Sequence, residues 1–266
     1  MSWLRRLVRL PGLVGLLFGG LLTVFLVFPL VSQARRDALV RRWSRMLLAC
    51  CGVRVREVVR TGAEPLAEQV GGRMLLANHV SWLDIFVIDA VAPSSFVAKS
   101  EIARWPLAGT LVARVGTVFI ERNRRRAVRE VIGTLDRRMR AGRRAAVFPE
   151  GTTSDGRQVL PFFGNLAQAA IDAGAPVVPI GLRYVDPDGV PSHAAAFIGD
   201  DHFLDAVWRI TGHPELIAEL HVLPAIDIVP GVTRHELADQ ARLAISRALD
   251  LALDDTLPEF YRDRAA

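Results

Sequence analysis

The 266-residue sequence is poor in cysteine and lysine. Its two cysteines, Cys50 and Cys51, are adjacent, so they fit neither a disulfide framework nor the spaced pairs of a zinc site. We expect ordinary apolar side chains there, and a weak indication of a reducing compartment. The sequence also lacks internal repeats and low-complexity linkers, and 51% of its residues are hydrophobic. These features argue against a repeat protein or a disordered chain.

Acidic residues are scarce near the N-terminus: residues 1–60 hold eleven arginines and two acidic side chains, whereas the rest of the chain is net negative. A basic end beside an apolar run is typical of contact with an anionic membrane surface, where each basic residue contributes about 1 kcal/mol. We therefore expect membrane lipids as partners, and no nucleic acid.

No charged residue occurs from Leu10 to Ala34, a stretch long enough to enter or cross a bilayer. Arginines flank it on both sides, so the positive-inside comparison leaves its orientation open. A cleavable signal peptide ending near Ala34 is the alternative, although the apolar run is long for one. Residues 35–51 have the apolar and basic faces of an interfacial helix. We expect residues 1–56 to form a two-helix membrane anchor.

Beyond residue 57, short apolar runs alternate with helical stretches, which predicts an α/β fold. The apolar runs cover residues 74–78, 96–99, 117–121, 145–150, 176–184 and 220–226, and amphipathic helices are expected at 125–141 and 234–252. The prediction is a single mixed-sheet domain of about six to seven strands flanked by helices, at 57–253, followed by a solvated tail at 254–266.

Polar residues interrupt the apolar pattern at residues 78–84, NHVSWLD, where a strand is expected to end. A carboxylate at Asp84 could hold the His79 ring in one tautomer and leave its other nitrogen free to take a proton. Taken alone, the spacing also fits a structural histidine with Asp84 as a helix cap. Ser81 is an alternative nucleophile, but no G-x-S-x-G elbow surrounds it, so capping or binding is favoured.

Two other strand ends carry candidate residues. The run GTVFIER ends at Arg122, whose guanidinium suits a phosphate because it can donate two parallel hydrogen bonds. The run FPEGTTS contains Glu150 and Gly151, and N–H groups in such a glycine turn can bind an oxyanion or a phosphate. A solvated helix start that faces lipid headgroups is the preferred interpretation for Arg124, Arg125, Arg126 and Arg129.

Taken in order, NHVSWLD, GTVFIER, FPEGTTS and VVPIG resemble the four sequence blocks of the glycerolipid acyltransferase family, which includes 1-acylglycerol-3-phosphate acyltransferases. The resemblance spans roughly residues 74–182. It implies acyl transfer from acyl-CoA or acyl carrier protein to a lysolipid in a single displacement, without a metal or organic cofactor. It also implies that His79 is the general base and Asp84 its orienting partner. Implied substrate contacts come from Asn78, Ser81, Arg122, Glu150, Gly151, Thr152 and Thr153.

One position departs from the family pattern. Members that act on lysophosphatidate commonly have arginine in the third block, E-G-T-R-S, where this chain has Thr153. Related enzymes with E-G-T-T-S act on other lysolipids, so a lyso-ornithine lipid is the alternative acceptor to 1-acylglycerol-3-phosphate. A serine-type lipid hydrolase and a non-catalytic lipid-binding scaffold are alternatives from other classes.

The cellular location is also an expectation at this point. Arginine supplies all the basic charge except Lys99, a composition that suits a bacterial genome rich in G and C. We expect the protein on the bacterial inner membrane, with its active site on the cytoplasmic side, where thioester donors occur.

Overall fold

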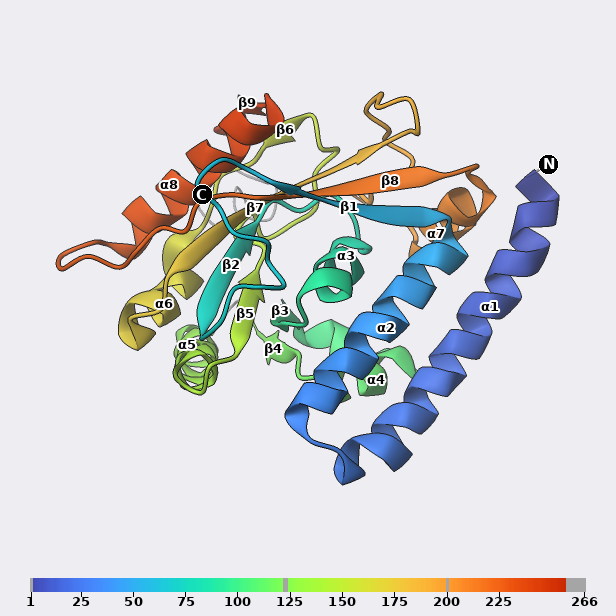
Figure 1. The fold of residues 1–266 in the computed structure, drawn as a ribbon, viewed down its shortest axis with the longest axis horizontal. Helices are drawn as coiled ribbons and strands as arrows, with labels where there is room; N and C mark the ends of the chain where they lie inside the picture. Colours follow the sequence, from blue (N-terminus) through green and yellow to red (C-terminus); the bar gives the residue numbers. More distant parts are fainter. Residues whose placement is uncertain (1, 122–123, 200, 257–266) are drawn as a thin grey trace.

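The structure, a computed structural model, describes residues 2–121, 124–199 and 201–256. The strands of its central sheet are β1 (Val53–Val59), β2 (Arg73–Ala77), β3 (Ser95–Lys99), β4 (Val118–Ile120), β5 (Arg144–Val147), β7 (Val177–Val185) and β8 (Leu216–Val222). Their order is β1-β8-β7-β2-β5-β3-β4, and all neighbours are parallel except β7 and β8 (Figure 1). The predicted mixed sheet is confirmed. Two short strands, β6 (Gln158–Val159) and β9 (Ala252–Leu253), pair separately.

Helices cover both faces of the sheet. They are α1 (Ser2–Leu22), α2 (Gln33–Cys51), α3 (Asp84–Val91), α4 (Ala108–Arg114), α5 (Arg125–Arg140), α6 (Gln168–Ala173), α7 (Phe203–Gly212) and α8 (Arg234–Leu249). Side chains of β2 alternate between two cores, as the period of a strand requires. Leu75 and Ala77 pack with α2, α3 and α7, whereas Met74 and Leu76 pack with α5, α6 and α8. Burial on both faces explains why β2 is a continuous apolar run.

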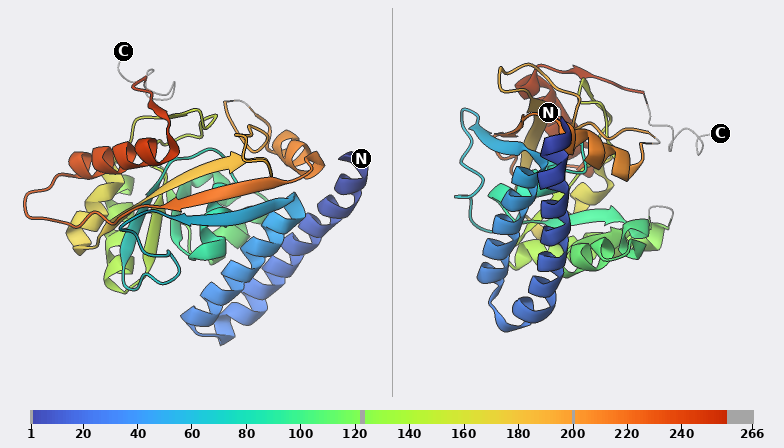
Figure 2. Two further views of the ribbon diagram at one scale, coloured as in Figure 1. Left: turned by 45° about the horizontal axis from the view of Figure 1, so that its top comes forward. Right: turned by 90° about the vertical axis from the view of Figure 1, so that its right-hand side faces the viewer.

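The two N-terminal helices lie side by side and antiparallel (Figures 1 and 2). The end of α1 passes through a π-helical turn, Thr23–Val27, and a 3-10 turn, Phe28–Leu30, before α2 returns. Trp43 on α2 donates from its indole Nε1 to the carbonyl of Leu16 on α1, at 2.9 Å. A Cβ at Gly20 would lie 2.9 Å from the same Nε1, so glycine allows this close crossing.

Helix α2 differs from the expected interfacial helix. Leu47, Leu48 and Cys51 on its last turns are buried in the core that covers the sheet. The helix therefore packs as part of the α/β fold, and the expected domain boundary after residue 56 falls within β1. The predicted tail is described as far as residue 256, and 257–266 lie outside the described residues.

The arginines at the start of α1 bind the end of α7. Arg5 donates to the carbonyl of Gly212, Arg6 to that of Trp208 and Arg9 to that of Thr211. Carbonyl groups at a helix C-terminus lack intrahelical partners and attract positive charge. These arginines therefore hold α1 along the domain. Among the described residues, 2–30 form the one helix long and apolar enough to cross a membrane, and 17% of its most apolar window is buried.

A carboxyl group is buried at the base of α3. Asp89 is 5% exposed, and its Oδ1 accepts a hydrogen bond from the backbone N–H of Ser94 at 2.9 Å. Burial raises the pKa of this carboxyl to about 8, with a smaller contribution of the same sign from Asp37. The folded protein therefore keeps a proton on Asp89 over a pH range in which the unfolded chain has lost it.

This shift predicts a pH-dependent gain in stability for Asp89→Asn. The wild type should lose stability as pH rises from about 4 to about 8, because the unfolded state binds fewer protons there. The variant lacks this loss, so its advantage should grow over that range, to at most about 6 kcal/mol. Denaturant unfolding across this range measures it, with Asp239→Asn on the exposed face of α8 as the control. An advantage independent of pH would contradict the assignment.

Candidate active site

Two of the polar segments singled out in the sequence meet at the carboxyl ends of β2 and β5, beside β7. Ends of neighbouring parallel strands form the usual ligand crevice of an open α/β sheet. Residues 78–84 follow β2, and 148–154 follow β5. The backbone N–H of Ser154 donates to the carbonyl of His79 at 2.8 Å, which joins the two segments.

His79 and Asp84 contact each other directly. The ring Nδ1 of His79 lies 2.9 Å from Oδ2 of Asp84. The Asp84 side chain is fully buried, whereas that of His79 is 18% exposed. A carboxylate accepts hydrogen bonds, so the contact assigns the ring proton to Nδ1 and leaves Nε2 unprotonated in the neutral ring. The geometry is that of a base with its orienting carboxylate.

The Asp84 carboxylate is held from several sides. Its Oδ2 also accepts hydrogen bonds from the backbone N–H groups of Val80, at 2.7 Å, and Ser81, at 2.9 Å. Its Oδ1 accepts from the Tyr184 hydroxyl at 2.7 Å. Burial and the neighbouring Asp84 raise the pKa of Tyr184 well above its ordinary value, so the hydroxyl keeps its proton. Asp84 is also the first residue of α3, where the helix dipole favours negative charge.

Asn78 and Ser81 serve the local structure. The side-chain amide of Asn78 donates to the carbonyl of Leu182 at 2.9 Å and accepts from its N–H at 2.7 Å. It thereby continues the β2–β7 pairing by one residue. Ser81 is fully buried, and its Oγ accepts a hydrogen bond from the N–H of Leu83 at 3.3 Å. Because both side chains are engaged in these hydrogen bonds, their positions do not fit the predicted contacts with the substrate. The burial of Ser81 also does not fit a role as nucleophile.

An aromatic wall lies against the histidine. Phe148 stacks on the His79 ring, with centroids 4.0 Å apart and planes at 12°, and Phe96 lies nearly parallel to Phe148 with centroids 6.0 Å apart. Apolar packing on one ring face limits the motion of His79 and keeps water from that side. Neither Phe148 nor Tyr184 was assigned to the site from the sequence, because both belong to apolar strand runs without a distinguishing signal.

Glu150 lies beneath the glycine turn, out of reach of an incoming acceptor. It is fully buried, and neither carboxyl oxygen has a hydrogen bond of normal geometry among the described residues. Burial raises its pKa well above the ordinary value, the His79 backbone N–H opposes part of this rise, and Asp84 adds to it. Gly151 has a φ of +72°, which favours glycine. The buried position of Glu150 therefore does not fit the expected contact between its carboxyl group and the acceptor.

Thr152 and Thr153 are half-buried in the same turn. The Thr153 hydroxyl donates to the carbonyl of Phe197, so the side chain ties the turn to the loop after β7. Arg122 lies outside the described residues, and its contact with a phosphate stays a prediction. The neighbouring Arg124 forms an ion pair with Glu121 at 3.0 Å and is exposed, as expected for a solvated helix start.

Comparison with known proteins agrees with this site. The Acyltransferase family model matches residues 57–183, which include both segments of the site. The chain is 38% identical to a 1-acyl-sn-glycerol-3-phosphate acyltransferase of Neisseria gonorrhoeae over 181 residues, 68% of this chain and 71% of that protein. It is 36% identical to a lyso-ornithine lipid O-acyltransferase of Pseudomonas aeruginosa over 214 residues, 80% of this chain and 79% of that protein.

The fold is also similar to a solved structure. The crystal structure of a 1-acyl-sn-glycerophosphate acyltransferase from Thermotoga maritima matches with a TM-score of 0.65, over 94% of this chain and 97% of that chain, at 22% identity. This likeness extends through the N-terminal helices as well as the sheet. The family model and the two relatives show that the chain belongs to the acyltransferase family.

Proposed function

We propose that the protein transfers a fatty-acyl group from acyl-CoA or acyl carrier protein to the free hydroxyl of a lysolipid. The proposed lysolipid is 1-acylglycerol-3-phosphate, and the product is then phosphatidate. The 2.9 Å contact between His79 Nδ1 and Asp84 Oδ2 carries the proposal, because it leaves Nε2 available as a base. Membership of the acyltransferase family and the names of the relatives support the reaction class.

The proposed mechanism is a direct displacement. Nε2 of His79 takes the proton of the acceptor hydroxyl while the oxygen attacks the thioester carbonyl. The new C–O ester bond forms, the C–S bond breaks, and the proton on His79 passes to the leaving thiolate. Asp84 stabilises the imidazolium that exists between the two transfers. These steps need no metal and no redox cofactor, and Ser81 takes no part as a nucleophile.

The acceptor headgroup is assigned on Arg122 and the wider family. The guanidinium of Arg122, two residues after β4 in the sequence, suits a phosphate better than the zwitterionic head of an ornithine lipid. The second candidate, a lyso-ornithine lipid, is favoured by Thr153, because a hydroxyl bonded to the Phe197 carbonyl brings no charge to the turn. The relative from Pseudomonas aeruginosa supports the same candidate.

Thr153→Arg separates the two acceptors. With 1-acylglycerol-3-phosphate as the natural acceptor, a second charged contact to its phosphate should lower KM by about tenfold or more. With a lyso-ornithine lipid, the same charge would be unmatched and activity should fall. Steady-state kinetics on both acceptors measures the change. Thr153→Val is the control, because it removes the hydrogen bond to Phe197 without adding charge. If KM for 1-acylglycerol-3-phosphate rises in Thr153→Arg and not in Thr153→Val, the assignment of 1-acylglycerol-3-phosphate as the acceptor is contradicted.

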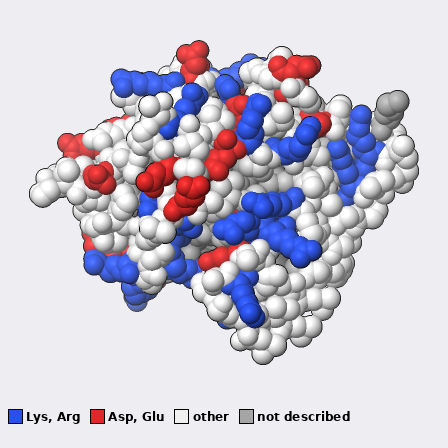
Figure 3. All heavy atoms as spheres, in the orientation of Figure 1, with Lys and Arg blue, Asp and Glu red and all other residues white. Residues whose placement is uncertain are grey.

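Placement on the cytoplasmic face of the inner membrane belongs to the same proposal. The end of the α1–α2 hairpin projects away from the sheet, and its surface is almost free of charge, with arginines on its flanks (Figures 1 and 3). Leu22, Leu26 and Leu30 are 61%, 63% and 84% exposed there. Because α1 is bound to α7 along the domain, insertion of the hairpin into one leaflet fits better than a free transmembrane span.

Charges at the hairpin end should release the protein from membranes. The double variant Leu26→Glu and Leu30→Glu should weaken partitioning onto anionic vesicles at least about tenfold, since each leucine buried in lipid contributes about 1.5–3 kcal/mol. Co-sedimentation with vesicles measures the binding. The control, Val70→Glu with Val190→Glu, adds the same charge at two exposed apolar residues elsewhere. Equal loss in both double variants would count against the hairpin as the insertion site.

Product identification tests the proposed acceptor directly. Purified protein is offered an equimolar mixture of lysolipids with one acyl donor, and the products are identified by mass spectrometry. The proposal predicts phosphatidate as the main product. If lyso-ornithine lipid is acylated and 1-acylglycerol-3-phosphate is not, the proposed acceptor is wrong, but the reaction class is retained.

A further inference from the structure

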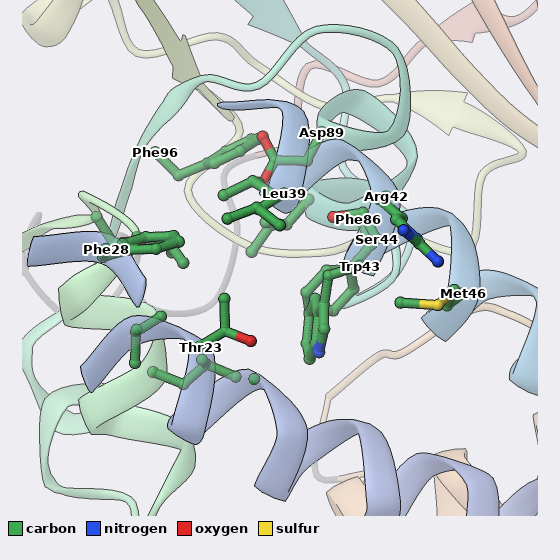
Figure 4. A pocket seen from close by; sticks show the side chains of 17 residues that line it. Thr23, Phe28, Leu39, Arg42, Trp43, Ser44, Met46, Phe86, Asp89 and Phe96 are labelled. Carbon is green, nitrogen blue, oxygen red and sulfur yellow. The ribbon is translucent and has the colours of Figure 1, made fainter. Parts of the chain in front are cut away.

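A cavity of about 260 Å³ lies between the N-terminal hairpin and the α/β domain. Its walls come from α1, α2, α3, α4 and β3, and most of its lining is apolar, including Leu39, Trp43, Phe86 and Phe96 (Figure 4). An aliphatic chain suits such walls, because binding removes the apolar surface of both the chain and the cavity from water.

The cavity begins one aromatic layer from the proposed base. Phe148 stacks on both His79 and Phe96, and Phe96 lines the cavity. On the second side, Phe86 lines the cavity and makes an edge contact with Trp82, three residues after His79 in the chain. These ring contacts join the lining of the cavity to the residues around the proposed base.

Two polar groups line this apolar cavity. Ser44 on α2 is 1% exposed, and its hydroxyl has no hydrogen-bond partner among the described residues. Asp89 on α3 is 5% exposed, and a backbone N–H engages its Oδ1. In Figure 4, Asp89 lies at the top of the cavity and Ser44 lies lower and to the right, beside Phe86.

Hydrogen bonds between the two helices fix this arrangement. Arg41 and Arg45, on either side of Ser44, donate to the carbonyls of Val91 and Ala90 at 3.2 and 2.8 Å. These carbonyls follow Asp89 directly, so the two bonds hold the middle of α2 against the end of α3 that carries the carboxyl. Buried hydroxyl and carboxyl groups are normally hydrogen-bonded, and an unpaired one lowers stability. A ligand group in this cavity that can both donate and accept would supply hydrogen-bond partners to these side chains.

We propose that this cavity selects an aliphatic chain that carries a hydroxyl group along its length, which accepts a hydrogen bond from the Asp89 carboxyl group and donates one to the Ser44 hydroxyl. The inference rests on the proposed acyl transfer, in which either the donor or the lysolipid supplies the chain. An unsubstituted chain fills the same apolar volume but leaves the Ser44 hydroxyl buried and unpaired. A site built to bind a hydroxyl discriminates strongly against an analogue that lacks it.

Transfer kinetics with matched chains test the selectivity. The full-length protein is given acyl-CoA donors of one chain length, with no hydroxyl or with a hydroxyl at successive carbons, and one unsubstituted lysolipid. In the second arm the hydroxyl is placed on the lysolipid chain instead. One arm should show an optimum position at which kcat/KM exceeds that of the unsubstituted chain about tenfold, the effect of one or two new hydrogen bonds. The arm that responds identifies which substrate supplies the chain.

Variants assign the preference to the two side chains. Ser44→Ala and Asp89→Leu should each reduce the ratio of hydroxylated to unsubstituted kcat/KM toward one. The matched control is Ser95→Ala, because Ser95 is 1% exposed and its hydroxyl also lacks a partner among the described residues, but it lies outside this cavity. The control should keep the wild-type ratio. No preference in the wild type, or a preference that survives both variants, would overturn the inference.

A binding measurement separates this inference from the proposed function. Free hydroxylated and unsubstituted fatty acids compete with a fluorescent fatty acid for the purified protein, without any transfer step. Selective displacement by the hydroxylated acid, together with absence of transfer to every lysolipid, would reject the proposed function and retain the cavity assignment. Normal transfer without selective displacement would reject the cavity assignment alone.

Discussion

His79→Ala is expected to lower kcat by about 10²–10⁴-fold, the usual contribution of a general base. The acceptor hydroxyl would then have to lose its proton to water, and the thiolate would leave without the proton that His79 returns. KM for both substrates should change little, because the ring acts on the reacting atoms and not on the headgroup or chain. Initial rates of thiol release at saturating donor and acceptor measure the effect.

The fold should tolerate this change. The His79 side chain is 18% exposed, makes a hydrogen bond to Asp84 and stacks on Phe148. The control is His235→Ala, which removes an imidazole from the exposed face of α8. Loss of activity in both variants, or near-normal turnover in His79→Ala, would contradict the assignment of the base.

Asp84→Asn is expected to lower kcat by a large part of the same factor and to destabilise the protein as well. The amide cannot stabilise an imidazolium on His79 as a carboxylate does. It also removes the charge to which two backbone N–H groups and Tyr184 donate, and such charge-assisted bonds contribute about 1.5–3 kcal/mol each. Transfer kinetics and denaturant unfolding measure the two effects separately.

Tyr184→Phe provides the comparison for Asp84→Asn. It removes one donor from Oδ1 but leaves the carboxylate charge and the contact with His79. Stability should fall in both variants, while kcat should fall far more in Asp84→Asn. Equal kcat losses would indicate that Asp84 acts by shaping the pocket, and full activity in Asp84→Asn would remove it from the mechanism.

Much of the sheet was predictable, because buried parallel strands are unmistakable apolar runs. Strand β1 was not predicted, since its residues alternate valine with charged side chains. The structure explains the charges, because β1 is an edge strand. Arg54 pairs with Glu215, just before β8, and Arg56 pairs with Glu219 on β8. Helix α3 was also missed, because it is buried on most sides and lacks an amphipathic pattern.

The site was predictable where its parts are local in sequence. His79 and Asp84 lie five residues apart, so a strand end followed by a turn is enough to suggest their contact. Tyr184 is 100 residues from Asp84 in sequence and reaches it through the pairing of β2 with β7, which no local pattern specifies. The burial of Glu150 and the bond from Thr153 to Phe197 likewise depend on how separate loops pack.

The central claim is that His79 activates the acceptor hydroxyl for direct attack on the thioester. The most direct measurement is the rate of thiol release from the donor with and without lysolipid, combined with the intact mass of the protein during turnover. Direct attack predicts thiol release that requires the lysolipid, equals ester formation mole for mole, and leaves the protein mass unchanged. Rapid thiol release without lysolipid, accompanied by an acyl group on the protein, would contradict it.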